Sequence, residues 1–112
     1  TLSLHDALPI SITLQKLQKQ QEYLSYHDKL TGLYNRNSFV SYTTDINPDE
    51  LNSLGAVSVD INGLKNFNKE FGRDYGDEVV IRVGEVLEEY FHTANVYRMT
   101  GDEYLVLVEN IT

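Results

Sequence analysis

Residues 95–109 read NVYRMTGDEYLVLVE, and this stretch decides how the rest of the chain is interpreted. A short apolar strand enters it at residues 95–99, and a longer apolar strand leaves it at residues 104–109. Between them lies a tight polar turn, Thr100–Glu103, which ends in two adjacent carboxylates. Carboxylates at a hairpin tip can hold a hard cation, although many acidic tips are simply solvated. The turn therefore becomes informative only together with the segments that precede it.

Composition limits the classes of function. The chain has 112 residues, enough for one small domain, and 41% of them are hydrophobic, so it is not disordered by composition. The formal net charge is -8, and a chain this acidic lacks the basic surface that binds polymeric nucleic acid or an anionic membrane. The sequence has no cysteine, hence no disulfide, and no apolar run long enough to span a bilayer. We expect a cytoplasmic domain, with any membrane anchor of the full-length protein in a missing N-terminal part.

The N-terminal region divides into two parts. Residues 1–10 (TLSLHDALPI) contain Pro9 and differ in composition from the helical segment after them. They are interpreted as non-native sequence. Residues 11–27 predict a helix. One side of this helix has the heptad spacing of a coiled-coil seam, formed by Leu14, Leu17, Gln21 and Leu24. This helix is either a solvated cap of the domain or a signalling helix from an upstream sensor domain. The second interpretation is favoured because the helix runs directly into Asp28.

The remaining residues predict helices and strands in alternation. A turn over 28–36 precedes a helix over 36–45, and Asn47 and Pro48 begin a short helical turn. Further along we expect a strand at 56–59 that ends at Asp60, an amphipathic helix from Leu64 to Phe71, a loop over 72–76, a helix from Asp77 to about His92, and the hairpin. The first strand must share a sheet with the hairpin.

Asp60 and Asp102 are candidate metal ligands. Asp60 ends the first strand and Asp102 lies at the hairpin tip, so the two carboxylates converge if these strands are neighbours. Two carboxylates and a backbone carbonyl, that of Ile61, make the incomplete oxygen shell with which proteins hold Mg²⁺ or Mn²⁺. The alternative for Asp60 is an ordinary helix N-cap.

Two further groups suit a nucleotide. Asn62–Lys65 opens a helix whose free N–H groups can receive a phosphate, although Lys65 is equally well an ordinary exposed lysine. Asn68 and Asp77 lie nine residues apart and offer an amide and a carboxylate, which suit the N–H donors and the acceptors of guanine. Alternatively, Asp77 only caps the following helix.

Three segments in this order resemble the GGDEF domain of diguanylate cyclases: Asp28–Arg36 (DKLTGLYNR), Asp60–Lys65 (DINGLK) and Thr100–Tyr104 (TGDEY). The resemblance covers roughly residues 23–112, and residues 28–112 are interpreted as a partial GGDEF domain. It implies an α/β (α+β) nucleotide-cyclase-like fold: a mainly antiparallel central sheet flanked by helices, incomplete at the C-terminus and preceded by a signalling-type helix. It also implies that two GTP molecules, held by a homodimer, condense into cyclic di-GMP with release of pyrophosphate.

The resemblance carries roles over to matching positions. It implies metal ligation by Asp60, Ile61 and Asp102, a catalytic role for Glu103 and Asp102, guanine recognition by Asn68 and Asp77, phosphate contacts from Gly63, Leu64, Lys65 and Gly101, and a wide turn framed by Asp28 and Arg36 as an ion pair. Each of these positions holds a residue of the required type.

Some positions depart from the family pattern. Thr100 stands where the family has Gly, so a branched side chain fills space beside the nucleotide. Tyr104 for Phe is a mild change, since the ring can still pack. Phe91 and Ala94 occupy the positions of the family's Arg-x-x-Asp feedback site, so product inhibition is not expected. Two rival interpretations remain: a degenerate module that binds GTP or only dimerises, and a plain dimerisation element led by the N-terminal helix.

Overall fold

The computed structural model describes residues 4–50, 53–92 and 94–109. Its elements, in chain order, are α1 (Leu4–Tyr26), β1 (Tyr34–Asn35), α2 (Arg36–Asp45), the 3-10 turn η1 (Pro48–Glu50), β2 (Leu54–Asp60), α3 (Leu64–Phe71), α4 (Arg73–Tyr90), β3 (Asn95–Arg98) and β4 (Glu103–Glu109). The expected helix over 36–45, the turn at Pro48 and the hairpin are confirmed.

The strands form one sheet in the order β1-β3-β4-β2. β4 pairs antiparallel with β3 on one side and with β2 on the other, whereas β1 runs parallel to β3. The mainly antiparallel sheet is therefore confirmed, and β2 does share it with the hairpin. β1 was not expected, because two residues are too short for a periodic hydrophobic signal.

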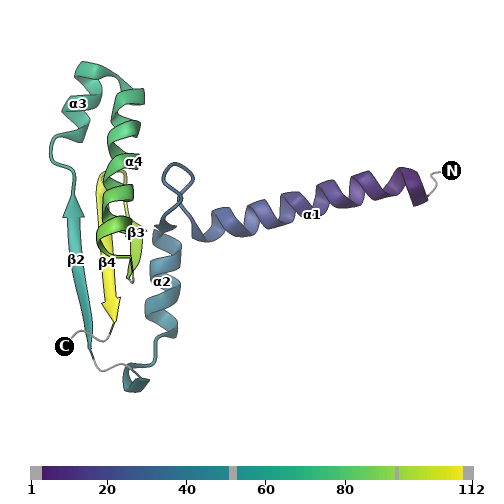
Figure 1. The fold of residues 1–112 in the computed structure, drawn as a ribbon, viewed down its shortest axis with the longest axis horizontal. Coiled ribbons are helices and arrows are strands. Elements are labelled where there is room, and N and C mark those ends of the chain that lie inside the picture. The colour runs from purple at the N-terminus through teal and green to yellow at the C-terminus, as the bar shows by residue number, and fades with distance from the viewer. Residues whose placement is uncertain (1–3, 51–52, 93, 110–112) are drawn as a thin grey trace.

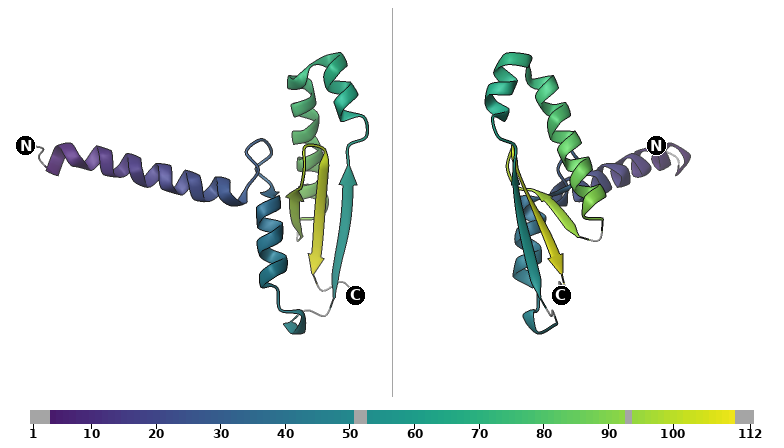
Figure 2. Two further views of the ribbon diagram at one scale, coloured as in Figure 1. Left: turned by 180° about the vertical axis from the view of Figure 1, so that it is seen from behind. Right: turned by 60° about the vertical axis from the view of Figure 1, so that its left-hand side comes forward.

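Helix α4 lies over one face of the hairpin, and α2 packs against β1 and β3 at the edge of the sheet (Figures 1 and 2). Because side chains alternate across a strand, Val96 and its partner Val106 face α4, where they join a buried cluster with Val80. Tyr97 faces the other way, and its ring meets the ring of Phe39 from α2 edge-on at 5.6 Å between centroids. The core is thus two thin apolar layers on either side of the two central strands.

Helix α1 extends away from the sheet as a rod (Figure 1) and, within the described residues, contacts only α2 and β1. All of its described side chains, residues 10–26, are exposed. The helix begins at Leu4, so the expected start at residue 11 is wrong. Pro9 lies in the second turn of this helix, where it has no N–H to donate to the backbone carbonyl of His5. That residues 1–10 are non-native stays a prediction.

The expected loop over 72–76 is also wrong, because α4 already begins at Arg73. The break between α3 and α4 is confined to Gly72, whose φ of 96° and ψ of 159° are accessible to glycine and strained for other residues. One residue therefore reverses the chain, and α3 folds back against α4. Within residues 4–50, 53–92 and 94–109, none of the helices combines the length and the apolar composition of a membrane-spanning segment.

Candidate nucleotide and metal site

The turn between β3 and β4 meets the C-terminal end of β2. Asp60, the last residue of β2, is the register partner of Glu103, the first residue of β4. The N–H of Ile61 then donates to the carbonyl of Asp102 at 2.9 Å, which extends the pairing beyond the strands. The backbone therefore holds Asp60, Asp102 and Glu103 at one end of the sheet.

The Asp60 carboxyl lies within the influence of both acidic neighbours. Partial desolvation, the negative charges of Asp102 and Glu103, and a hydrogen bond shared with Asp102 together raise the pKa of Asp60. Such crowding of like charges is what a divalent cation relieves, and the Ile61 carbonyl follows immediately in the chain. Within the part of the chain that the structure describes, no three acidic or histidine side chains gather into a metal-binding group. The residues thus fit an incomplete shell that Mg²⁺ would complete with water and phosphate oxygens.

The N-terminus of α3 lies just beyond Asp60. Gly63 is its N-cap, with a left-handed φ of 76° and no side-chain cap, so Asp60 is not the helix cap. The first backbone bond of the helix runs from the N–H of Phe67 to the carbonyl of Gly63 at 2.9 Å. The preceding N–H groups, starting with those of Leu64 and Lys65, have no intrahelical acceptor and can bind a phosphate oxygen.

Asn68 and Asp77 come from the two helices that pack against each other. Asn68 lies in the last turn of α3, and Asp77 lies in the second turn of α4, partly buried. Because α4 begins at Arg73, the alternative that Asp77 caps this helix is wrong. The Oδ1 atom of Asn68 is buried and has no hydrogen-bond partner within the described residues.

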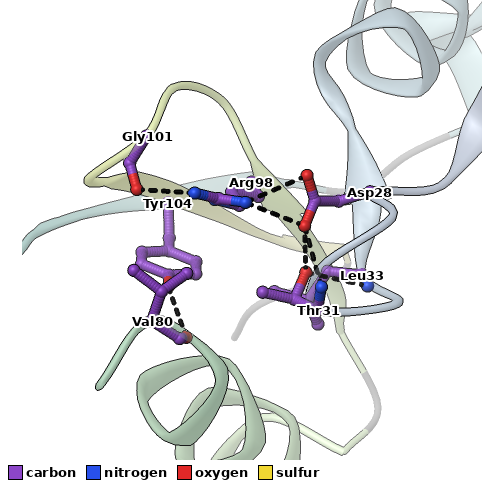
Figure 3. A network of polar contacts seen from close by, with 7 residues as sticks. All are labelled: Asp28, Thr31, Leu33, Val80, Arg98, Gly101 and Tyr104. Atoms are coloured by element: carbon purple, nitrogen blue, oxygen red, sulfur yellow. Dashed lines mark hydrogen bonds and ion pairs between the residues drawn. The ribbon is translucent and has the colours of Figure 1, made fainter. Parts of the chain in front are cut away.

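Arg98 connects this end of the sheet to the turn after α1 (Figure 3). Its Nη1 donates to both carboxylate oxygens of Asp28, at 3.2 and 3.0 Å, and its Nη2 donates to the carbonyl of Gly101 at 2.9 Å. The expected ion pair between Asp28 and Arg36 is therefore wrong: Arg36 begins α2, and the partner of Asp28 is Arg98. Sequence reasoning missed Arg98, although a lone arginine at the end of an apolar strand was an available signal.

Comparison with known families decides how this geometry is classified. The family model described as "Diguanylate cyclase, GGDEF domain" matches residues 25–112. The chain belongs to the GGDEF family. The matched range contains all three segments that carried the resemblance, from Asp28 to Tyr104.

Curated relatives and solved structures agree with this GGDEF assignment. Diguanylate cyclase DgcM of Escherichia coli strain K12 is 31% identical over 105 residues, which are 87% of this chain and 25% of DgcM. The cyclic di-GMP phosphodiesterase PdeR of the same organism is 32% identical over 98 residues, which are 86% of this chain and 15% of PdeR. This GGDEF chain thus spans a quarter or less of either relative.

The fold is shared with the crystal structure of the coiled coil and GGDEF domain of DgcB from Caulobacter crescentus in complex with c-di-GMP. That comparison has a TM-score of 0.78 at 21% sequence identity and covers 97% of this chain and 59% of the DgcB chain. At this identity the likeness concerns the fold alone, and it confirms the expected GGDEF architecture.

Thr100, which the resemblance marks as a departure from the family motif, contacts both acidic residues of the turn through its side chain. Its hydroxyl lies 3.3 Å from Oδ1 of Asp102 and 3.0 Å from Oε1 of Glu103. Both distances allow a hydrogen bond, and the single hydroxyl proton can be donated to either carboxylate. The departure therefore adds a polar contact as well as volume.

Tyr104 is accommodated by the core. Its side chain is only 1% exposed, and its hydroxyl donates to the carbonyl of Val80 in α4 at 2.6 Å (Figure 3). The ring packs as expected, and the additional hydroxyl has a partner. Burial raises the pKa of Tyr104 to about 12, with Arg98 lowering it and Asp28 raising it by smaller amounts.

Phe91 and Ala94, at the feedback-site positions, lie at the other end of α4. Phe91 caps the helix, and the N–H of Ala94 donates to its carbonyl at 2.9 Å. Both residues line a cavity of about 220 Å³ together with His27 and Glu88. Neither position carries the charged side chain of the feedback motif, and the absence of product inhibition stays a prediction.

Proposed function

We propose that this GGDEF domain binds GTP with Mg²⁺ or Mn²⁺ and acts as one half of a diguanylate cyclase dimer in cyclic di-GMP signalling. The observation that carries the proposal is the convergence of Asp60 and Asp102 at the end of the sheet, directly before the uncapped N-terminus of α3. Metal ligands beside free helix N–H groups suit a metal-bound triphosphate.

Each residue has a defined task in this proposal. Asp60, Asp102 and the Ile61 carbonyl would hold the cation, whose contribution when bound is to neutralise charge on the phosphates. The N–H groups of Leu64 and Lys65 receive phosphate oxygens. Neutralisation and positioning of this kind are the main contributions a protein makes to phosphoryl chemistry.

The base is recognised between the two packed helices. Asp77 accepts the two N–H donors on one edge of guanine, and Asn68 pairs with a neighbouring donor or acceptor. Adenine presents a different pattern on that edge, so a carboxylate at this position disfavours ATP. Glu103, beside Asp60 in the sheet register, is the further acidic group available near the reacting phosphate.

The reaction requires two copies of the domain. The 3′-hydroxyl oxygen of each GTP loses its proton to solvent and forms a bond to the α-phosphorus of the other GTP. The bond from that phosphorus to the oxygen of the β-phosphate breaks, and pyrophosphate leaves with the bonding electron pair. The exposed seam of α1, Leu14, Leu17 and Leu24, is a surface through which two chains can pair. We therefore propose a homodimer formed through α1 and the GGDEF domain, downstream of a sensor domain.

A second candidate function is a degenerate GGDEF module that binds GTP, or only dimerises, and regulates a neighbouring domain. The observation that favours it is the Thr100 hydroxyl, which occupies hydrogen-bonding positions on both Asp102 and Glu103. The relative PdeR is named a phosphodiesterase and is as similar to this chain as DgcM is, so similarity alone does not separate the two candidates.

Calorimetry of the intact protein with GTP and with ATP, each with Mg²⁺, tests nucleotide binding. We expect GTP to be preferred, and Asp77→Ala to weaken GTP binding by roughly 1–3 kcal/mol, because guanine donors lose their acceptor. Glu78→Ala, an exposed change one residue along α4, is the control and should leave binding unchanged. Equal GTP affinity in the Asp77→Ala protein would remove the guanine assignment.

Product formation separates the two candidates. Cyclic di-GMP made from GTP and Mg²⁺ by the intact protein, and lost in Asp102→Asn, supports the cyclase. Binding of GTP without product supports the degenerate module. Absence of GTP binding contradicts the cyclase and leaves only the dimerising form of the degenerate module.

A further inference from the structure

We infer that Gly76 is a positioning residue for guanine recognition: its missing side chain leaves the space in which the Asn68 amide lies. The inference rests on the proposed function, because it assigns a purpose to the placement of a base-recognising side chain. Gly76 itself contacts no part of the nucleotide in this proposal.

The steric observation is direct. A Cβ atom built on Gly76 would lie 1.5 Å from Oδ1 and 2.6 Å from Cγ of Asn68, whereas real Cβ contacts essentially never fall below 3.0 Å. Gly76 is buried within α4, so the amide fills the volume that a side chain at this position would take. Asn68 and any larger residue at 76 are therefore mutually exclusive in the observed arrangement.

Backbone conformation does not explain the glycine. The positive-φ glycines among the described residues are Gly32, Gly63 and Gly72, and Gly76 is not one of them. A position with helical dihedral angles inside α4 would be more stable with alanine. The reason for a glycine here is thus the space it leaves free.

Folding stability does not explain the position of the amide either. The Oδ1 atom of Asn68 is buried against Gly76 without a hydrogen-bond partner within the described residues, which is unfavourable for the folded protein. The acceptor capacity of this oxygen is therefore unused within the described residues. Two backbone hydrogen bonds hold Asn68 near α4. The N–H of Gly72 donates to the backbone carbonyl of Asn68 at 2.9 Å, and the N–H of Gly76 donates to the backbone carbonyl of Gly72 at 3.3 Å.

Asp77 follows Gly76 directly in α4, and its side chain leaves the helix about 100° further round than the direction that the Asn68 amide occupies at residue 76. A methyl group at 76 would force the Asn68 side chain to rotate away, which a terminal amide can do without disrupting the helices. The expected consequence is a loss of base discrimination with the fold retained.

The test is a double-mutant cycle in the intact protein, with calorimetric affinities for GTP and ATP in the presence of Mg²⁺. Gly76→Ala should lower the preference for GTP over ATP by about tenfold or more, as should Asn68→Ala, and combining them should cause little additional loss, because the methyl group then enters empty space. Gly84→Ala is the matched control, since it is also a buried glycine of α4 but faces Leu33, with a Cβ 3.2 Å from that side chain. Its preference for GTP should equal that of the parent.

The outcomes distinguish this inference from the proposed function. Full GTP preference in a folded Gly76→Ala protein overturns the inference alone, as does an additive double variant. A parent protein that binds no GTP overturns both. Thermal unfolding of each variant establishes whether it is folded. If Gly76→Ala is unfolded and adding Asn68→Ala does not restore folding, the inference is also overturned, because the clash would then involve another residue.

Discussion

Arg98 and Asp28 are 70 residues apart in the chain, yet they form a two-pronged ion pair with Nη1 at 3.2 and 3.0 Å from the two carboxylate oxygens. Their side chains are only 15% and 22% exposed. Asp28 also accepts the N–H of Thr31 at 2.9 Å, and Arg98 also donates to the Gly101 carbonyl at 2.9 Å. One ion pair thus ties the end of the α1 segment to the turn that carries Asp102 and Glu103.

Replacement of Arg98 by alanine should lower the free energy of unfolding by roughly 1.5–3 kcal/mol, since it removes charge-assisted hydrogen bonds and leaves Asp28 unpaired in a half-buried position. Arg98→Lys should recover only part of this, because an ammonium group cannot span Asp28 and Gly101 together. Urea unfolding measures both. An Arg98→Ala protein as stable as the parent would show that the pair contributes nothing.

The same pair predicts a pH dependence of stability. Burial raises the pKa of Asp28, but hydrogen bonds from Thr31 and Arg98 and the charge of Arg98 outweigh it and lower the pKa below the ordinary value of 3.8. A lowered folded-state pKa means that the stabilisation is complete above pH 3.8 and is lost as the pH falls through the folded-state pKa. The difference in free energy of unfolding between the parent and Asp28→Asn should therefore shrink on acidification. A difference that stays constant down to the acid transition would contradict the lowered pKa.

Substitutions at Thr100 separate volume from hydrogen bonding. We expect slow cyclic di-GMP formation by the parent and a faster rate in Thr100→Gly, which removes both the methyl and the hydroxyl group. Thr100→Val keeps the shape and removes the hydroxyl contacts with Asp102 and Glu103. A tenfold rate change corresponds to only about 1.4 kcal/mol of activation free energy, so either effect is measurable.

The comparison of the two rates identifies the cause. If the Thr100→Val protein is as fast as the Thr100→Gly protein, the hydroxyl group slows the reaction. If the Thr100→Val protein is as slow as the parent, the volume of the branched side chain slows it. A Thr100 protein that already matches its Gly variant would show that the turn tolerates the side chain. Initial rates from GTP and Mg²⁺ at matched dimer concentration provide this measurement.

The hydroxyl of Tyr104 should contribute to stability through its bond to Val80. Tyr104→Phe should lower the free energy of unfolding by about 1 kcal/mol, the usual value for one hydrogen bond, with the ring still packed. Since the folded-state pKa of Tyr104 is raised to about 12 from 10.0, its contribution is present below pH 10.0 and declines as the pH rises toward 12. Tyr90→Phe, at a residue that is 79% exposed, is the control and should change nothing.

Removal of one carboxylate from the acidic pair should change the response to metal. Asp60→Asn relieves the repulsion from Asp102 and Glu103, so the metal-free variant should be at least as stable as the parent. Mg²⁺ should raise the Tm of the parent and have a smaller effect on the variant, because a ligand that binds the folded state stabilises it. Thermal unfolding with and without Mg²⁺ checks this. An equal Mg²⁺ effect in both proteins would place the cation elsewhere.

The sequence by itself determined the positions of α2, α3, β2 and the hairpin, and the residue types of the candidate site. Helical periodicity located α2 and α3, the apolar runs located β2 and the hairpin, and the polar turn at Thr100–Glu103 indicated where carboxylates gather. These features depend on contacts between residues close in the chain, so short-range patterns record them. The family resemblance required only that three such segments occur in order.

Only the tertiary structure decided which side chains meet. It paired Asp28 with Arg98 in place of Arg36 and placed the Asn68 amide over Gly76. The start of α4 at Arg73 was equally hidden, because a glycine-containing stretch is compatible with a loop or a helix until α3 packs against it. Each of these outcomes depends on segments distant in sequence or on side-chain volume, and no local pattern encodes either.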